Sequence, residues 1–557
     1  MDNRYKYLPL AAVLAVATAC EDMDTVPEGS FVTADQKSDI YSNDASKTSA
    51  SVDGAFLAMS AYCPNYSSVG RHHADFGYPS VMIFTDCNGE DIVGTVTGYN
   101  WMSSEIRFND RAISSDNSQI MWQNLYSYIF SANNIIASMD AAGENPQLLL
   151  SAAQGHALRA FCYFQLAQLY QFNYVGHESS PCVPIITDEN SADVAANGAK
   201  RATVQEVYDL IYSDLDKAVD LLAKAKTGGA VRSGKHLVDL ATAYGLRARV
   251  NLVTRNWNGA LADANAAIKN SDAVPSSIAD ASRPAFSSLS EGNWMWGIDI
   301  SESDDVVSSN IINWISHIGT LNYGYGFALG GQRISTKLFN SIAATDVRKG
   351  WWLSEDGEAC HMSDGKKVDH FSAEDQNAWV EFTDVTIGEY YPPYTTVKFG
   401  PYNGVVATST NANDIPLMRI EEMYLVKAEA ELMAGGDALG TLTSFVKQYR
   451  DPQYAFDGAD LHEEIWRQRR VELWGEGMSW FDIMRLGVGI DRRGSGFHKD
   501  YVFVLSGDDT KLLWPIPQSE VEANPALSVD DYNPTSPTPT RVPDEAKATI
   551  ADEKINL

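Results

Sequence analysis

Cysteine is scarce in this sequence. The 557 residues include six cysteines, namely Cys20, Cys63, Cys87, Cys162, Cys182 and Cys360. Their spacing matches no common metal-binding motif, so the sequence gives no indication of a cysteine-ligated metal. Beyond Cys20 the number is odd, which leaves at least one thiol unpaired. A bridge between Cys63 and Cys87 stays open as one pairing, but the sequence does not favour it.

Long apolar runs are also missing. The N-terminal run at residues 8–19 is shorter than the roughly 20 residues that a membrane-spanning helix needs. Arg4 and Lys6 precede this run, and small residues lead from it to Cys20, an arrangement that resembles a bacterial lipobox. The resemblance implies a signal peptide at residues 1–19, a lipid such as palmitate on Cys20, and a polar tether over residues 20–50. Membrane association is then expected through the lipid anchor alone.

Positive charge is in short supply. The chain has 42 Lys and Arg against 73 Asp and Glu, which gives a formal net charge of −31. Such a surface repels nucleic acid and anionic lipid headgroups, so neither is expected as a partner.

Catalytic motifs are lacking as well. Asp86, Glu90 and Asp91 are the closest group of carboxylates to a glycosidase pair, but acidic residues so near one another are typical of a solvated loop. The sequence "HEEIW" at 462–466 lacks the second histidine of a zinc protease, and the adjacent pair at 72–73 has no evident third ligand. We therefore predict a protein that is not an enzyme, with no catalytic residue, no metal site and no cofactor. Calcium is not indicated.

The patterns that are present are helical. Residues 155–170 carry apolar side chains on most sides, which predicts a buried helix, and residues 203–225 have one apolar face. Thr203 and Glu206 form the sequence of a capping box at the start of that second helix. Residues 244–269 place a small-residue stripe where a tetratricopeptide repeat has one, and residues 419–445 contain a similar helix pair that turns at two glycines.

Several segments resemble, in the same order, the SusD/RagB family of Bacteroidetes outer-membrane nutrient-binding lipoproteins. They are "ALRAFCYFQLAQLY", "RATVQEVYDLIYSDLDKAVDLL", "DIPLMRIEEMYLVKAEAEL", "RQRRVELWGEGMSWFDIMRLG" and "LLWPIPQSEVEANPAL". The resemblance implies a mainly α fold, a tetratricopeptide-repeat-like helical scaffold whose long loops form the ligand-binding side. It also implies a SusC-like TonB-dependent outer-membrane transporter as partner. The acidic residues directly after Cys20 are similar to the surface-export signal of lipoproteins from this phylum, which implies a surface-exposed location at the outer membrane.

On this basis we divide the chain into regions. They are the signal peptide and tether, a helical region with aromatic loops at 51–270, a loop-rich ligand-binding insertion at 271–410, and the family's C-terminal region at 411–557. The alternating charges of Arg469, Arg470, Glu472, Glu476, Asp482 and Arg485 predict ion pairs rather than catalysis.

Aromatic loops supply the candidate ligand contacts, because flat rings suit the C–H faces of sugars and neighbouring polar groups read hydroxyls. The candidates are Trp101, Trp314, Tyr325, Tyr323, Tyr99, Asn100, Tyr66, Arg71, Asp75 and Tyr78. Trp294 and Trp296 alternate as in a strand and are assigned to structure. Trp351 and Trp352, with the aromatic run at 389–402, form either a second contact surface or a loop packed on the scaffold.

The predicted function is therefore a surface lipoprotein that binds an oligosaccharide or polysaccharide and delivers it to the transporter for nutrient uptake. Three alternatives stay open. They are a RagB-like protein that binds peptides, a lipid-anchored glycan hydrolase, and an assembly scaffold that binds a partner protein without a small ligand.

Overall fold

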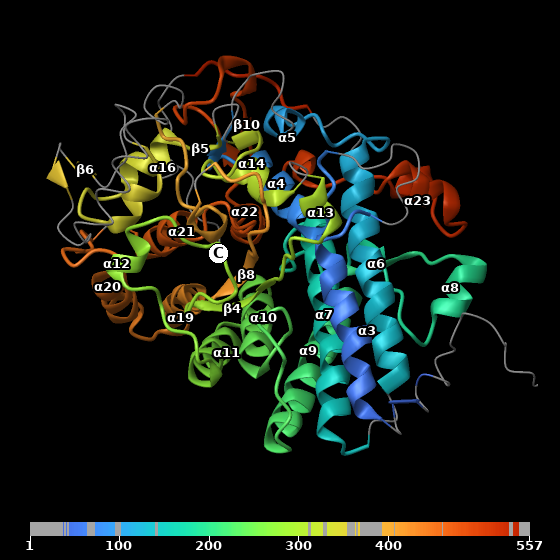
Figure 1. The fold of residues 1–557 in the computed structure, drawn as a ribbon. Helices are drawn as coiled ribbons and strands as arrows, with labels where there is room; N and C mark the ends of the chain where they lie inside the picture. Colours follow the sequence, from blue (N-terminus) through green and yellow to red (C-terminus); the bar gives the residue numbers. More distant parts are fainter. Residues whose placement is uncertain are drawn as a thin grey trace, which may run out of the picture.

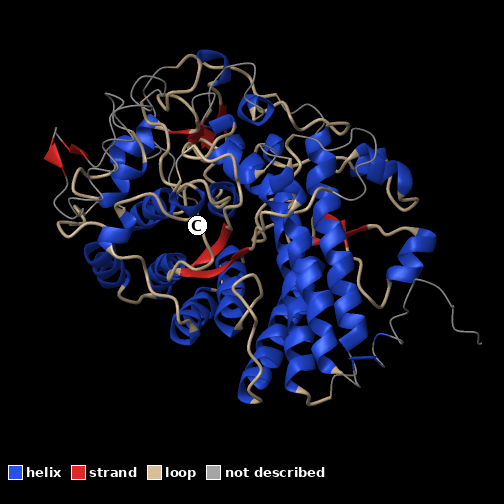
Figure 2. Ribbon diagram, in the orientation of Figure 1, coloured by secondary structure: helices blue, strands red, loops and turns tan. Residues whose placement is uncertain are grey.

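The structure is a computed structural model that describes residues 37, 40–41 and 44–544, with gaps at 64–72, 95–101, 140–142, 310–312, 327–330, 354–361, 364–365, 368–392, 406, 459 and 534–537. Long helices stand side by side at the right of the view, and shorter helices and loops fill the left side and the top (Figure 1). Strands are few and short (Figure 2). The predicted mainly α fold is confirmed.

The α-helices are α3 (Thr48–Leu57), α4 (Tyr78–Asn88), α5 (Ser103–Arg107), α6 (Asp116–Met139), α7 (Pro146–Tyr170), α8 (Ser191–Asn197), α9 (Val204–Thr227), α10 (Leu240–Val253), α11 (Trp257–Asn270), α12 (Ile278–Ala281), α13 (Asp305–Ser308), α14 (Trp314–Ile318), α16 (Thr336–Ser341), α19 (Ile420–Ala434), α20 (Ala438–Tyr449), α21 (Leu461–Glu472), α22 (Ser479–Leu486) and α23 (Gln518–Ala523). Short 3-10 turns include η1 (Ala45–Lys47), η2 (Ala58–Ser60), η3 (Val347–Trp351) and η5 (Tyr402–Gly404).

The described strands pair in antiparallel twos, β1 with β5, β2 with β3, β4 with β8, β6 with β7 and β9 with β10. Their bounds are β1 (Ile92–Val93), β2 (Pro181–Pro184), β3 (Arg201–Thr203), β4 (Trp294–Ile298), β5 (Arg333–Ile334), β6 (Met362–Ser363), β7 (Lys366–Lys367), β8 (Ile415–Arg419), β9 (Ile490–Asp491) and β10 (Val504–Leu505). Trp294 and Trp296 lie in β4 and are buried, as the alternation predicted.

Consecutive helices pack as pairs. α6 lies against α7, α7 against α9, α10 against α11, and α19 against α20. The pair α6–α7 comes close because Gly155 faces it: a Cβ on Gly155 would lie 2.9 Å from Cγ1 of Ile136. In α11 the stripe of Ala260, Ala264 and Ala267 is fully buried, which confirms the predicted small-residue face. The predicted capping box also forms, with Oγ1 of Thr203 accepting from the Glu206 amide.

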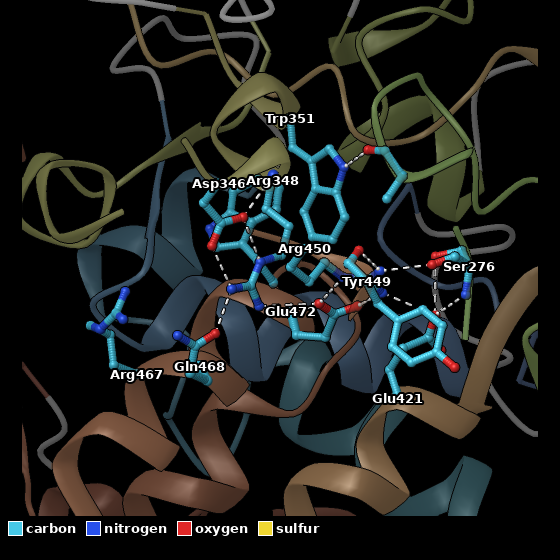
Figure 3. Close-up of polar contacts among 12 residues, drawn as sticks. Ser276, Asp346, Arg348, Trp351, Glu421, Tyr449, Arg450, Arg467, Gln468 and Glu472 are labelled. Atoms are coloured by element: carbon cyan, nitrogen blue, oxygen red, sulfur yellow. Dashed lines mark hydrogen bonds and ion pairs between the residues drawn. The ribbon is translucent and has the colours of Figure 1, made fainter. Parts of the chain in front are cut away.

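Buried charges join the C-terminal helices to the loop-rich insertion (Figure 3). Glu472, at the end of α21, accepts hydrogen bonds from Arg419 at 3.0 Å, Arg450 at 2.8 Å and Arg348 at 3.2 Å. All four side chains are fully buried. Burial alone would raise the pKa of Glu472, but the three guanidinium groups hold that pKa well below its usual range. The carboxylate therefore stays ionised in the core.

The same network continues through Glu476. Its carboxylate accepts from Lys398 Nζ at 2.6 Å and from two nitrogens of Arg419. The predicted ion pairs of the 469–485 segment are thus confirmed, and Arg485 and Arg469 both pair with Asp482. The segment is not one helix, however, because α21 ends at Glu472 and α22 starts at Ser479. Most of the pairs join different elements rather than turns of a single helix.

Replacement of Glu472 tests how much this network contributes to the stability of the protein. Glu472→Ala leaves three buried guanidinium groups without their shared carboxylate, so we expect the free energy of unfolding to fall by about 3–5 kcal/mol. Urea titration followed by circular dichroism measures it. Glu463→Ala, on the partly exposed side of the same helix, is the matched control and should change stability by under about 1 kcal/mol. Equal effects of the two substitutions would contradict the role given to Glu472.

Candidate functional site

The loop that carries most described candidates runs from α14 to Gly326. Among the predicted residues that the structure describes, Tyr323 has the most exposed side chain, at 44%. Its amide donates to the carbonyl of Thr408 at 2.8 Å, and its carbonyl accepts from Nδ2 of Asn411 at 2.9 Å. The N–H and the C=O of Tyr323 are therefore both hydrogen-bonded, while its ring is exposed. Gly324 permits this turn, since a Cβ there would lie 2.5 Å from Cβ of Ser316.

Asparagine side chains fasten the loop from below. Nδ2 of Asn322 donates to Oδ1 of Asn411 at 3.1 Å and to Oδ1 of Asn413 at 2.8 Å. Nδ2 of Asn313 donates to the carbonyl of Asn411 at 3.3 Å, and Nδ2 of Asn413 to that of Gly400 at 2.8 Å. These buried amides were missed in the sequence. The close spacing of Asn411 and Asn413 was a signal, but their partners are about 90 residues away.

A stack of rings stands beside Tyr323. Phe76 stacks on His317 with centroids 5.4 Å apart, and His317 stacks on Tyr325 at 4.7 Å. The hydroxyl of Tyr325 bonds Nδ1 of His73 at 2.9 Å, and Nε2 of His317 donates to the His73 carbonyl at 3.2 Å. Burial lowers the pKa of His317 to about 3, so this ring is neutral in ordinary buffers. The stack is a rigid, uncharged support for the loop.

Three other candidates turn inward. Trp314 is only 1% exposed and meets Phe399 edge-on, with centroids 4.9 Å apart, because the short helix α14 directs its ring into the core. Tyr78 packs edge-on against Phe161, and Oδ2 of buried Asp75 accepts from the Cys63 amide at 2.8 Å. These positions correct the prediction that the three side chains face a ligand. Their packing supports the loops instead.

The remaining candidates lie outside the described residues. They are Tyr66, Arg71, Tyr99, Asn100 and Trp101, and they stay predictions, as does the lipidation of Cys20. The gaps at 64–72 and 95–101 border the described segment 73–94, which contains His73, Phe76, α4 and β1.

The aromatic residues at 351–352 pack on the scaffold. Both rings are buried, and Nε1 of Trp351 donates to the carbonyl of Ala281 at 2.8 Å. Lys398 lies over the Trp351 ring, 4.8 Å from its centroid. Of the two readings of this segment, the packed loop is therefore the one that the described residues support.

The carboxylates considered for glycosidase chemistry are not solvated. Glu90 and Asp91 are buried against Arg470, with Oε1 of Glu90 accepting from Nη2 at 2.7 Å. Asp86 is buried too and accepts from the Gly477 amide at 2.8 Å. The expectation of a solvated loop is therefore wrong, because basic and amide partners from the C-terminal region enclose all three groups.

Other chemical candidates also have structural partners. Nε2 of His462, from the "HEEIW" segment, lies 3.2 Å from Oε1 of Glu429, which also pairs with Arg485. Cys63 and Cys87 are both buried and no disulfide joins them. Within the described part of the chain, no cluster of three or more His, Cys, Asp or Glu side chains is arranged to hold a metal ion.

Asp86 makes the free energy of unfolding depend on pH. Burial, with a smaller contribution from Asp91, raises the pKa of Asp86 to about 7. Because the folded pKa lies above the unfolded value, its contribution to stability is greatest below about pH 4 and is lost as the pH rises through about 7. We expect Asp86→Asn, which keeps the acceptor for Gly477, to gain up to about 4 kcal/mol relative to the wild type between pH 4 and pH 8.

Urea unfolding at both pH values measures this difference. The exposed Asp209→Asn serves as the control and should run parallel to the wild type at both pH values. A constant gap between Asp86→Asn and the wild type would contradict the raised pKa.

The architecture defines a helical-repeat protein that carries an exposed aromatic loop above its paired helices. Comparison with known proteins gives the same result. A family model described as "SusD family" matches residues 334–534, and one described as "Starch-binding associating with outer membrane" matches residues 83–252. The chain belongs to the SusD family, as the sequence motifs indicated.

Similar proteins extend the comparison over most of the chain. SusD-like protein P2 of Formosa agariphila is 25% identical over 456 residues, which cover 75% of this chain and 81% of that protein. A SusD-like carbohydrate binding protein of Bacteroides vulgatus has a TM-score of 0.67 at 21% identity, covering 88% of this chain and 98% of its own. Surface glycan-binding protein A of Bacteroides thetaiotaomicron, solved with laminarihexaose, has a TM-score of 0.58 at 16% identity, covering 88% and 99%. These structures share the fold.

Within the described residues, no helix is both long enough and apolar enough to cross a bilayer.

Proposed function

We propose that this protein is a surface lipoprotein that captures a neutral oligosaccharide or polysaccharide and delivers it to a SusC-like TonB-dependent transporter in the outer membrane. The observation that carries the proposal is Tyr323, an exposed ring whose backbone is fixed on both sides by hydrogen bonds. Because the backbone that carries the ring is already fixed, less of this segment has to be ordered on binding. The glycan-binding relatives described above support the ligand class.

The protein's part is binding rather than catalysis. The three carboxylates nearest to a catalytic arrangement are committed to structural partners, and the family is one of binding proteins. The charge of −31 further favours a neutral ligand over an anionic one. Weak binding suffices beside a transporter, because tethering raises the local ligand concentration into the millimolar range.

Affinity gel electrophoresis through a panel of embedded polysaccharides tests ligand capture. The chain from Asp22 onward keeps every described residue and lacks the lipid. We expect a neutral polysaccharide such as starch or laminarin to retard it. Tyr323→Ala should weaken binding about two- to tenfold, the value of one aromatic contact, because the stacking face is lost.

Tyr323→Phe is the matched control, since it keeps the ring and removes only the hydroxyl. Trp101→Ala, from the second predicted loop, should add to the loss. Retardation by no polysaccharide, with binding of a peptide library instead, would replace the glycan proposal by the peptide alternative. Release of new reducing ends from any polysaccharide would contradict the non-catalytic role.

The lipid anchor is tested at its attachment residue. We expect Cys20→Ser to move the protein from the membrane fraction to the soluble fraction, and to abolish labelling by radioactive palmitate, because the thiol at the expected attachment position is lost. Cys182→Ser, at a buried thiol, is the control and should stay in the membrane fraction. A membrane-bound, labelled Cys20→Ser variant would show that the anchor lies elsewhere.

A further inference from the structure

A pocket of about 670 Å³ opens on the side of α6. Two stripes of α6 form its floor, one aromatic with Trp122, Tyr126 and Phe130 at four-residue spacing, and one polar with Gln123, Ser127 and Ser131. Its walls come from three distant segments, the end of η2 with Tyr62, the residues after β2, and α23 with Glu520. Figure 1 shows α6 at the outer edge of the long helices, on the side nearest to α8 and α23.

The rings of this pocket are fixed by their polar ends. Nε1 of Trp122 donates to Oε2 of Glu520 at 3.2 Å, and the hydroxyl of Tyr126 donates to the carbonyl of Pro184 at 2.7 Å. The hydroxyl of Tyr62 donates to Oγ of Ser309 at 2.7 Å. Trp122 and Tyr126 lie tilted against each other with centroids 4.7 Å apart. Trp122 is only 3% exposed, so a ligand meets Tyr62, Tyr126 and Phe130, of which the two tyrosines are already ordered. That order lowers the entropy cost of binding.

Phe130 is the most exposed of the rings that line the pocket. Its side chain is 66% exposed at the edge of the pocket, although a phenyl ring loses favourable burial energy there. An exposed ring next to a concave aromatic surface is the arrangement expected where another molecule completes the burial.

The lining also restricts the chemistry of that molecule. Among the described residues that surround the pocket there is no Lys, Arg or His, and the one charged group is Glu520. An anion would meet no counter-charge there and would face the carboxylate. Hydroxyl and amide groups from Ser127, Ser131 and Gln123 stand beside flat ring faces, a combination that suits a neutral ring with both hydroxyls and C–H surfaces.

We propose that the α6 pocket is a second glycan subsite, one that binds a neutral sugar ring apart from the Tyr323 loop. The proposal rests on the proposed function for its ligand class. The volume lies within the range of about 300–1,000 Å³ that is typical of small-molecule sites. Two subsites on one chain let a long glycan bind more tightly than either subsite alone, through the effective concentration of the second contact.

Variants on the solvent-facing side of α6 test the subsite without disturbing the core. Ser131→Trp places a large ring in the pocket, and Phe130→Ala removes the exposed one. Ala137→Trp is the matched control, because it adds the same ring at an exposed position of the same helix that does not line the pocket. Thermal unfolding by circular dichroism establishes that all three variants fold.

The assay is affinity gel electrophoresis of the chain from Asp22 onward, with starch and laminarin as embedded polysaccharides. We expect Ser131→Trp and Phe130→Ala to lower affinity about two- to tenfold, as Tyr323→Ala does, while Ala137→Trp binds like the wild type. The affinity should be the same at 50 and 500 mM salt, since a neutral ligand is not screened.

The outcomes separate the two proposals. Wild-type binding that is weakened by Tyr323→Ala but unchanged by both pocket variants overturns the α6 subsite and leaves the proposed function in place. Wild-type binding that is weakened only by the pocket variants supports the subsite and removes the Tyr323 loop from the contact. Strong salt dependence overturns the neutral-ligand assignment. Absence of wild-type binding to either polysaccharide overturns the subsite and the glycan proposal together.

Discussion

Three arginines share the carboxylate of Glu472. The contact between the C-terminal helices and the loop-rich insertion depends on this interaction. Arg348 belongs to the loop-rich insertion, Arg419 is the last residue of β8, and Arg450 directly follows α20, so one side chain joins three separate segments. Such charges cannot be tolerated singly in the interior, because each loses its hydration on folding. Their burial is compatible only with the folded arrangement in which every buried charge has its partner. The network therefore selects one docking of the loops on the helices.

That docking determines what the surface can present. Lys398 extends the network from Glu476 to the Trp351 ring. The paired helices supply a stiff base, in which small residues such as the alanines of α11 let neighbouring helices lie close together. A constant scaffold of this kind can carry different functions, because function depends on the sites placed on it and not on the fold alone.

Features that depend on residues close together in the sequence were predicted correctly. The capping box at Thr203, the alanine stripe of α11 and the glycine turn after α19 are local patterns, and all formed. The sequence failed where the deciding partner is remote. Glu90 and Asp91 looked solvated because Arg470, some 380 residues later, cannot be assigned to them from spacing.

The candidate site shows the same limit. Trp314 and Tyr323 each follow an asparagine in the same aromatic segment, yet Trp314 packs inward against Phe399, while a hydrogen bond from Asn411 holds the backbone of Tyr323 at the surface. The pocket on α6 had no separate signal, because Trp122, Tyr126 and Phe130 have the spacing of an ordinary core stripe. Only the positions of η2, β2 and α23 reveal that part of this stripe is left uncovered.

The amide ladder of Asn313, Asn322, Asn411 and Asn413 has a consequence for the conditions under which the exposed ring is available. Amides neither titrate nor carry net charge, and the neighbouring His317 stays neutral above about pH 3. The hold on the Tyr323 loop is therefore indifferent to acidity and to salt. For the surface lipoprotein proposed above, the same face would stay toward the surrounding fluid as the composition of that fluid changes.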